Sequence, residues 1–105
     1  MTNSNIPDVH ALDREIPPGK VLLAQPGSDP KPMADRTVLD RFVRGDGIEV
    51  RLEAVTAGWA VAGSTMRWDN GYFGVFWMID GNRHGQRFER FDEAADFFRK
   101  KRPGG

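Results

Sequence analysis

The fold expected for this chain depends on the stretch YFGVFWMI, residues 72–79. Successive side chains of a strand point to opposite faces of a sheet, and here both the odd and the even positions are apolar. A strand with two apolar faces is typical of the middle of a sheet, where both faces are covered. Turn signals bound the stretch, Asn70-Gly71 before it and Asp80-Gly81 after it. We therefore expect residues 72–79 to form a central strand.

The neighbouring stretches predict further strands and a closing helix. Residues 48–54 alternate apolar and charged side chains, the period of a half-buried strand. The run 59–68 ends at Asn70-Gly71, which strongly favours a type I′ hairpin turn and predicts Trp68 opposite Phe73. A fourth strand is expected around residues 86–91. Asp92 can then cap a helix whose apolar side chains recur at helical spacing until Pro103.

Proline marks the organisation of the chain, because six of its seven prolines precede residue 33. Proline removes a backbone donor and disfavours helix in the residue before it. We expect a flexible, largely irregular arm over 1–33, in which Val21–Leu23 could add as a short edge strand. Residues 38–43 fit a helical turn or a first strand.

The predicted fold class is α+β, a four-stranded antiparallel β-meander with one C-terminal helix packed on one face. Residues 34–102 form the sheet-plus-helix domain and 103–105 a disordered tail. A chain of 105 residues accommodates one domain of ordinary size.

Composition limits the possible partners and compartments. Fifteen Lys and Arg balance fifteen Asp and Glu, so no long-range field steers nucleic acid or an anionic membrane toward the chain. The absence of cysteine excludes a disulfide framework, thiolate zinc sites and thiol catalysis, and is typical of the cytoplasm. No run approaches the roughly 18 apolar residues of a membrane span, and no signal peptide is recognisable. We expect a cytoplasmic protein without membrane contact.

The sequence favours a non-enzymatic role. It has neither a glycine-rich phosphate loop nor a nucleophile elbow. Its two histidines, His10 and His84, lie far apart, and its carboxylates form no closely spaced acid–base pair. We expect no catalytic residue, no metal and no small-molecule cofactor.

The predicted register around Asn70-Gly71 separates two faces of the sheet. One face would form the core beneath the helix, with Phe97 and Phe98 packing beside Trp77. Arg67 would face Gly74 on the other face, where its guanidinium could lie between the rings of Tyr72 and Phe76. The residues expected on this second face are Trp59, Val61, Thr65, Arg67, Tyr72, Phe76 and Met78.

The second face is too apolar for ordinary solvated surface. Three coverings remain open: the chain's own residues 1–43, a partner protein or second subunit, and nucleic acid. Basic side chains also gather late in the chain, where they could stabilise the helix macrodipole or contact phosphate. These are Arg83, Arg87, Arg99, Lys100, Lys101 and Arg102.

Residues 68–99 combine an aromatic strand, a basic strand and the helix start FDEAA at 91–95. This pattern resembles the sheet-plus-helix DNA-binding modules of tyrosine recombinases and of plant ethylene-response transcription factors. The resemblance implies a sheet in the major groove, contacted through Arg67, Tyr72, Arg83 and Arg87. The order of strands and helix also resembles single-strand-binding transcription cofactors, whose sheets stack bases.

Zero net charge places a protein-interaction or inhibitory module first, with the second sheet face as its binding surface. The partner would be another protein or a second copy of the chain. A nucleic-acid-binding module using the same face and the basic C-terminus is the alternative. The candidate binding residues are Trp59, Arg67, Tyr72, Phe76, Met78, Arg83 and Arg87, with Arg99, Lys100, Lys101 and Arg102 in the basic C-terminus.

Overall fold

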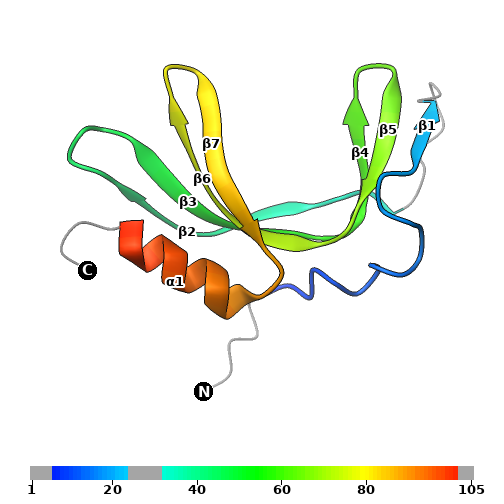
Figure 1. The fold of residues 1–105 in the computed structure, drawn as a ribbon, viewed down its shortest axis with the longest axis horizontal. Helices are drawn as coiled ribbons and strands as arrows, with labels where there is room; N and C mark the ends of the chain where they lie inside the picture. Colours follow the sequence, from blue (N-terminus) through cyan, green and yellow to red (C-terminus); the bar gives the residue numbers. More distant parts are fainter. Residues whose placement is uncertain (1–5, 24–31, 102–105) are drawn as a thin grey trace. The chain divides into compact units, whose positions relative to one another are not determined.

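A computed structural model describes residues 6–23 and 32–101, and its fold is mostly β with one C-terminal helix (Figure 1). The α+β class is therefore confirmed. Residues 38–43, for which strand and helix were both open, belong to a strand. The elements of the described residues are β1 (Val21–Leu23), β2 (Arg36–Val43), β3 (Glu49–Val55), β4 (Gly58–Ala62), β5 (Thr65–Asp69), β6 (Tyr72–Ile79), β7 (Asn82–Phe88) and α1 (Phe91–Lys101).

The strands form two antiparallel sheets instead of the single meander expected. One sheet has the order β1-β5-β4 and the other the order β2-β3-β6-β7. The run 59–68, expected as one strand, folds back on itself at Gly63-Ser64, so that Trp59 lies opposite Trp68. Val21–Leu23 pairs with β5 as an edge strand, within the stretch expected to be an irregular arm.

Contacts divide the chain into two compact units. The first unit comprises the described residues up to Arg36 together with Val55–Gly71. The second comprises Thr37–Ala54 and the described residues from Tyr72 onward. The segment boundaries expected at residues 33 and 102 stay a prediction, and the expected tail 103–105 lies outside the described residues. No helix in the described ranges has the length and apolar character needed to span a bilayer.

The first unit is built around two tryptophans. Trp59 and Trp68 are 3% and 0% exposed, and their rings meet edge to face with centroids 5.5 Å apart. Such aromatic pairs contribute about 0.5–1.5 kcal/mol beyond the area they bury. Leu12 and Ile16, from the stretch expected to be an arm, pack against this cluster. Of the three coverings considered for the second face, Trp59 therefore has the first: the chain's own N-terminal residues cover it.

Asn70-Gly71 connects the two sheets and does not close a hairpin. The backbone N–H of Gly71 donates to Asp13 Oδ1 at 2.7 Å, and a Cβ at Gly71 would collide with the backbone carbonyl of Val9. That carbonyl also accepts a hydrogen bond from the N–H of Ala57, at 3.1 Å. The glycine is therefore needed for close approach of the N-terminal backbone, and not for the positive φ of a type I′ turn.

The second unit confirms β6 as an inner strand, lying between β3 and β7. Its turn to β7 is the one expected at Asp80-Gly81, where φ angles of 52° and 79° fit a type I′ turn. Helix α1 packs on one face of this sheet through three aromatic pairs, all with ring centroids within 6 Å of each other. The pairs are Phe73–Phe91 at 5.7 Å, Phe42–Phe98 at 5.1 Å and Phe88–Phe97 at 5.4 Å.

Helix α1 begins one residue earlier than the predicted cap. Asp92 lies in the first turn, where Arg90 donates to its carboxylate from Nε at 3.0 Å and from Nη2 at 2.8 Å. This hydrogen-bonded pair lowers the pKa of Asp92 and raises the pKa of Arg90. A carboxylate in the first turn also interacts favourably with the helix macrodipole.

The close approach at Gly71 gives a test of the first unit. Gly71→Ala should lower the free energy of unfolding by about 1–3 kcal/mol or more, because the added methyl group meets backbone atoms that cannot rotate away. Gly45→Ala is the matched control, since a Cβ there meets no atom within 4 Å. Urea unfolding measures both, and equal effects of the two substitutions would contradict the close-approach role.

Candidate interaction face

The four-stranded sheet of the second unit has two chemically different faces. Phe73 and Trp77 of β6 lie on the helix side, in contact with Phe91 and Lys101 respectively. The alternate residues of β6 lie on the other side, as the alternation in the sequence predicts. We call this second side the arginine–aromatic face, made of Glu53 from β3, Tyr72, Phe76 and Met78 from β6, and Arg83 and Arg87 from β7.

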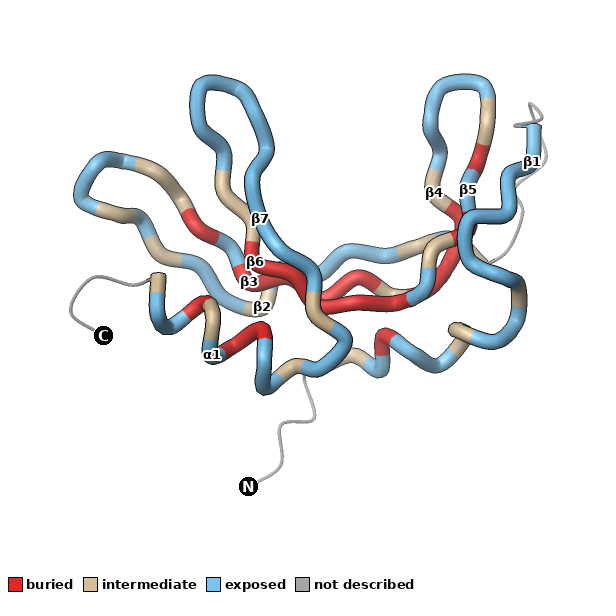
Figure 2. Tube along the Cα trace, viewed as in Figure 1, coloured by how far each residue is buried: buried red, intermediate tan, exposed pale blue. Residues whose placement is uncertain are grey.

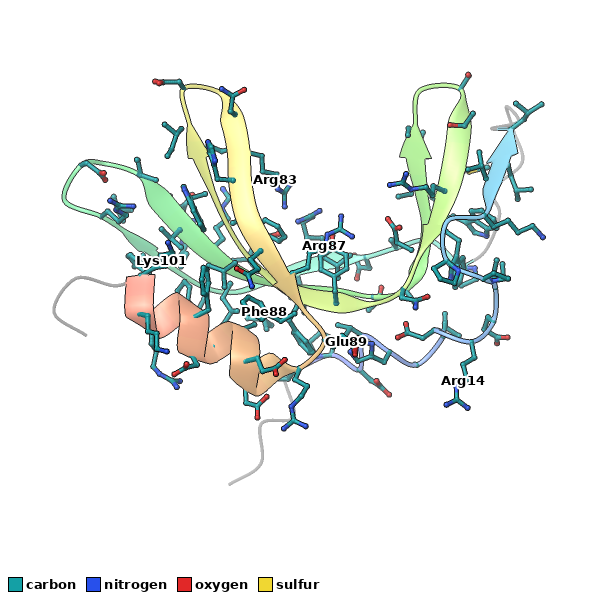
Figure 3. All side chains as sticks on the ribbon, viewed as in Figure 1. Arg14, Arg83, Arg87, Phe88, Glu89 and Lys101 are labelled. Carbon is teal, nitrogen blue, oxygen red and sulfur yellow. The ribbon has the colours of Figure 1, made fainter. Side chains whose placement is uncertain are left out.

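Two arginines cover the aromatic rings of this face. The guanidinium carbon of Arg83 lies 4.2 Å from the ring centroid of Phe76, and that of Arg87 lies 4.2 Å from the centroid of Tyr72. The two rings meet edge to face at 6.5 Å. Cation–π contacts of this kind contribute about 0.5–2 kcal/mol each. In Figure 3 both arginines extend from the same side of β7, whereas Phe88 lies toward the helix.

Two glycines make room for the central ring. Gly85 is the cross-strand neighbour of Phe76, and Gly74 is the cross-strand neighbour of Arg87. A Cβ at either glycine would collide with the ring of Phe76, and a Cβ at Gly85 would also meet the carbonyl of Val75. The ring therefore lies against the sheet over both glycines, which is the close packing that glycine in a strand allows.

A buried carboxylate forms an ion pair with Arg83. Glu53 is 3% exposed, and its Oε1 lies 3.3 Å from Nη2 of Arg83, whose side chain is 48% exposed. A buried charge is stable only when it is paired and hydrogen-bonded. The alternation of residues 48–54 predicts Glu53 on the polar side of its strand and contains no signal for this burial. The ion pair holds one edge of a guanidinium whose face lies on the Phe76 ring.

A groove of about 390 Å³ adjoins the arginine–aromatic face toward the strand ends. Met78, 52% exposed, contributes apolar surface to it. Among the other charged side chains that line the groove, Glu49 accepts from Arg51 at 3.0 Å and from Arg41 at 3.3 Å. The residues of the groove that matter here are Glu49, Arg51, Glu53, Phe76, Met78 and Arg83.

The structure brings together five of the seven residues proposed for the sheet face, Tyr72, Phe76, Met78, Arg83 and Arg87. It places the other two, Trp59 and Arg67, in the first unit. Trp59 is part of the buried tryptophan cluster, and Arg67 lies opposite Ala60 and Val21. The expected contact between Arg67 and Gly74 is therefore wrong, because β5 does not pair with β6. Arg87 is the guanidinium that stands opposite Gly74.

The described basic residues at the end of α1 have partners in the helix or in β6. Asp96 pairs with Arg99 at 3.4 Å and with Lys100 at 3.2 Å. The ammonium of Lys101 lies 4.6 Å from the ring centroid of Trp77. Arg102 lies outside the described residues. These contacts fit a stabilised last helical turn, since cations there interact favourably with the helix macrodipole.

Both histidines have local partners. His10 Nδ1 lies 2.6 Å from Asp13 Oδ2, and the other oxygen of Asp13 accepts the N–H of Gly71. His84 stacks on Trp77 with ring centroids 6.3 Å apart. Over residues 6–23 and 32–101, no group of three or more acidic, histidine or cysteine side chains could hold a metal ion. The arginine–aromatic face, by contrast, combines exposed guanidiniums with aromatic rings.

Comparisons of the chain with protein-family models, with curated proteins and with solved structures found no match. The resemblance of residues 68–99 to DNA-binding modules gains no support from them.

The Arg83–Glu53 pair can be tested by a double-mutant cycle. Arg83→Met leaves a buried carboxylate without this cation, so its cost should fall once Glu53→Gln has removed the charge. We expect a coupling of about 1–2 kcal/mol in the free energy of unfolding, measured by urea denaturation. The exposed pair Arg41–Glu49, probed by Arg41→Met and Glu49→Gln, should couple by less than about 0.5 kcal/mol. Equal coupling in both cycles would contradict the buried role of Glu53.

Proposed function

We propose that this chain is a non-catalytic binding module that recognises another protein through its arginine–aromatic face. The observation that carries the proposal is the pair of exposed arginines held over aromatic rings, Arg83 on Phe76 and Arg87 on Tyr72. Arginine, tyrosine and tryptophan are the residues most enriched at the energetic centres of protein interfaces. A regulatory or inhibitory role follows if binding blocks the partner's own site.

Preorganisation supports this function. An arginine in water loses side-chain entropy when a ligand immobilises it, about 0.5–1.5 kcal/mol for each immobilised side chain. The stacked guanidiniums of Arg83 and Arg87 are already held by their rings, and Arg83 also by Glu53. Their N–H edges can still donate to carboxylates, which arginine binds in bidentate geometry. The face is thus suited to a partner that presents acidic side chains.

The same geometry is less suited to nucleic acid. Bases stack on open aromatic rings, whereas here guanidiniums lie over the rings of Phe76 and Tyr72. Glu53 and the nearby Glu49 add negative charge beside the arginines, and the whole chain has no net charge. Nucleic acid remains the second candidate, favoured by the presence of Arg83 and Arg87 on one face of the sheet.

Two further expectations belong to the same proposal. A non-catalytic role is supported by the pairing of the titratable groups near the face, Glu49 with two arginines and Glu53 with one. A cytoplasmic location is supported by a sequence without cysteine.

A displayed random-peptide library tests the proposal. We expect selection on the immobilised chain to yield peptides that bind the double variant Arg83→Gln/Arg87→Gln at least about tenfold more weakly, a change of about 1.4 kcal/mol. The control Arg14→Gln/Lys20→Gln removes the same charge from exposed positions of the first unit and should bind like the unaltered chain. Thermal unfolding of both variants checks their fold.

Oligonucleotide binding separates the two candidates. Phosphate-driven binding falls steeply as salt rises, with a slope that counts the phosphates neutralised. We expect no measurable affinity for single- or double-stranded oligonucleotides at about 50 mM salt. Tight, salt-sensitive oligonucleotide binding, together with selected peptides that ignore Arg83 and Arg87, would overturn protein recognition by this face.

A further inference from the structure

Strand β7 is one of the two edge strands of the four-stranded sheet, the other being β2. It pairs with β6 over all seven of its residues, without a bulge, and among the described residues no strand lies on its other side. Six of the seven residues are exposed, as Figure 2 shows along the strand. The strand has no proline to block pairing. A long regular edge of this kind is a template for an additional strand.

The register tells which backbone groups of β7 point outward. In a two-residue hairpin the two residues that flank the turn, here Ile79 and Asn82, form both backbone hydrogen bonds with each other. Hydrogen-bonded pairs then alternate along the ladder, so the N–H and C=O groups of Arg83, Gly85 and Arg87 point away from β6. The side chains of the two arginines lie on the arginine–aromatic face. One edge therefore offers backbone donors and acceptors together with two guanidiniums.

The charge of β7 determines which kind of strand can pair with its open edge. Strand β7 carries Arg83, His84 and Arg87 and no acidic residue. A second copy of the chain would suit it poorly. The antiparallel register that pairs all seven residues places Arg83 of each copy opposite Arg87 of the other. Like charges directly opposite each other destabilise a strand pair. An acidic strand would instead place a carboxylate opposite each guanidinium.

We infer that an extended acidic segment of the partner protein adds antiparallel to β7, an inference that rests on the proposed function. Acidic side chains opposite Arg83 and Arg87 would stand four residues apart in that segment. The residue between them would lie opposite Gly85, which has no side chain, and can reach the ring of Phe76 across it. The partner motif is therefore acidic-x-apolar-x-acidic, with the x side chains on the helix side of the sheet.

The probe for this inference is the fluorescein-labelled peptide Thr-Glu-Thr-Leu-Thr-Glu-Thr, measured by fluorescence polarisation. Its motif reads the same in both directions, so its two glutamates stand opposite the two arginines whichever way the peptide runs. We expect binding that weakens at least about tenfold with Arg83→Gln/Arg87→Gln, and that changes less than about twofold with the control Arg14→Gln/Lys20→Gln. Replacing both glutamates of the peptide by lysine should abolish binding.

Backbone pairing is tested separately from charge. N-methylation of the central leucine amide removes the N–H that would pair with Gly85, and should weaken binding at least about tenfold. If the methylated and unmethylated peptides bind alike, the arginines recognise acid without strand addition and the inference is overturned. It is also overturned if the library peptides depend on Arg83 and Arg87 but lack alternating acidic residues, an outcome that leaves the proposed function intact. Library peptides independent of both arginines would instead remove the proposed function.

Discussion

The central constraint in the second unit is that β6 has two apolar rows of side chains, and a sheet can hide only one of them beneath a single helix. Helix α1 covers the row with Phe73 and Trp77. The opposite row is covered by Arg83 and Arg87, side chains with a planar, weakly hydrated face and a polar edge. This is why guanidiniums and not aliphatic side chains suit the second row: they shield the rings and keep their donors in water.

In each unit, a glycine allows another part of the chain to lie where a side chain would otherwise be. At Gly71 the backbone of Val9 occupies the place of a side chain, which ties the N-terminal stretch to the end of β5. At Gly74 and Gly85 the ring of Phe76 occupies it, so the ring lies low enough for Arg83 to cover it. In each case the missing Cβ creates a specific contact between parts that are separated along the chain or across the sheet.

These contacts explain what the sequence could and could not predict. The extent of β6, its two faces, the turn at Asp80-Gly81 and the helix depend on local patterns and were predicted. Asn70-Gly71 was misinterpreted because a glycine required for close approach has the same local signature as one required for positive φ. That error set the register, and a wrong register misassigns faces and neighbours together, which is why Trp59 and Arg67 were expected beside Tyr72. The contact of buried Glu53 with Arg83 joins residues 30 positions apart in the sequence, and no local pattern predicts it.

The zero net charge of the chain conceals a difference in charge between β3 and β7, the two strands that flank β6. Glu49 and Glu53 of β3 are paired with arginines, whereas β7 carries Arg83, His84 and Arg87 with no acidic residue of its own. Beyond about 8–10 Å such charges are screened and cancel, so the chain has little power to steer a distant partner. At hydrogen-bond distance they do not cancel, because each guanidinium meets the groups directly opposite it. Net charge therefore argues against recognition over long range, and the composition of a single edge strand argues for recognition of acid at contact.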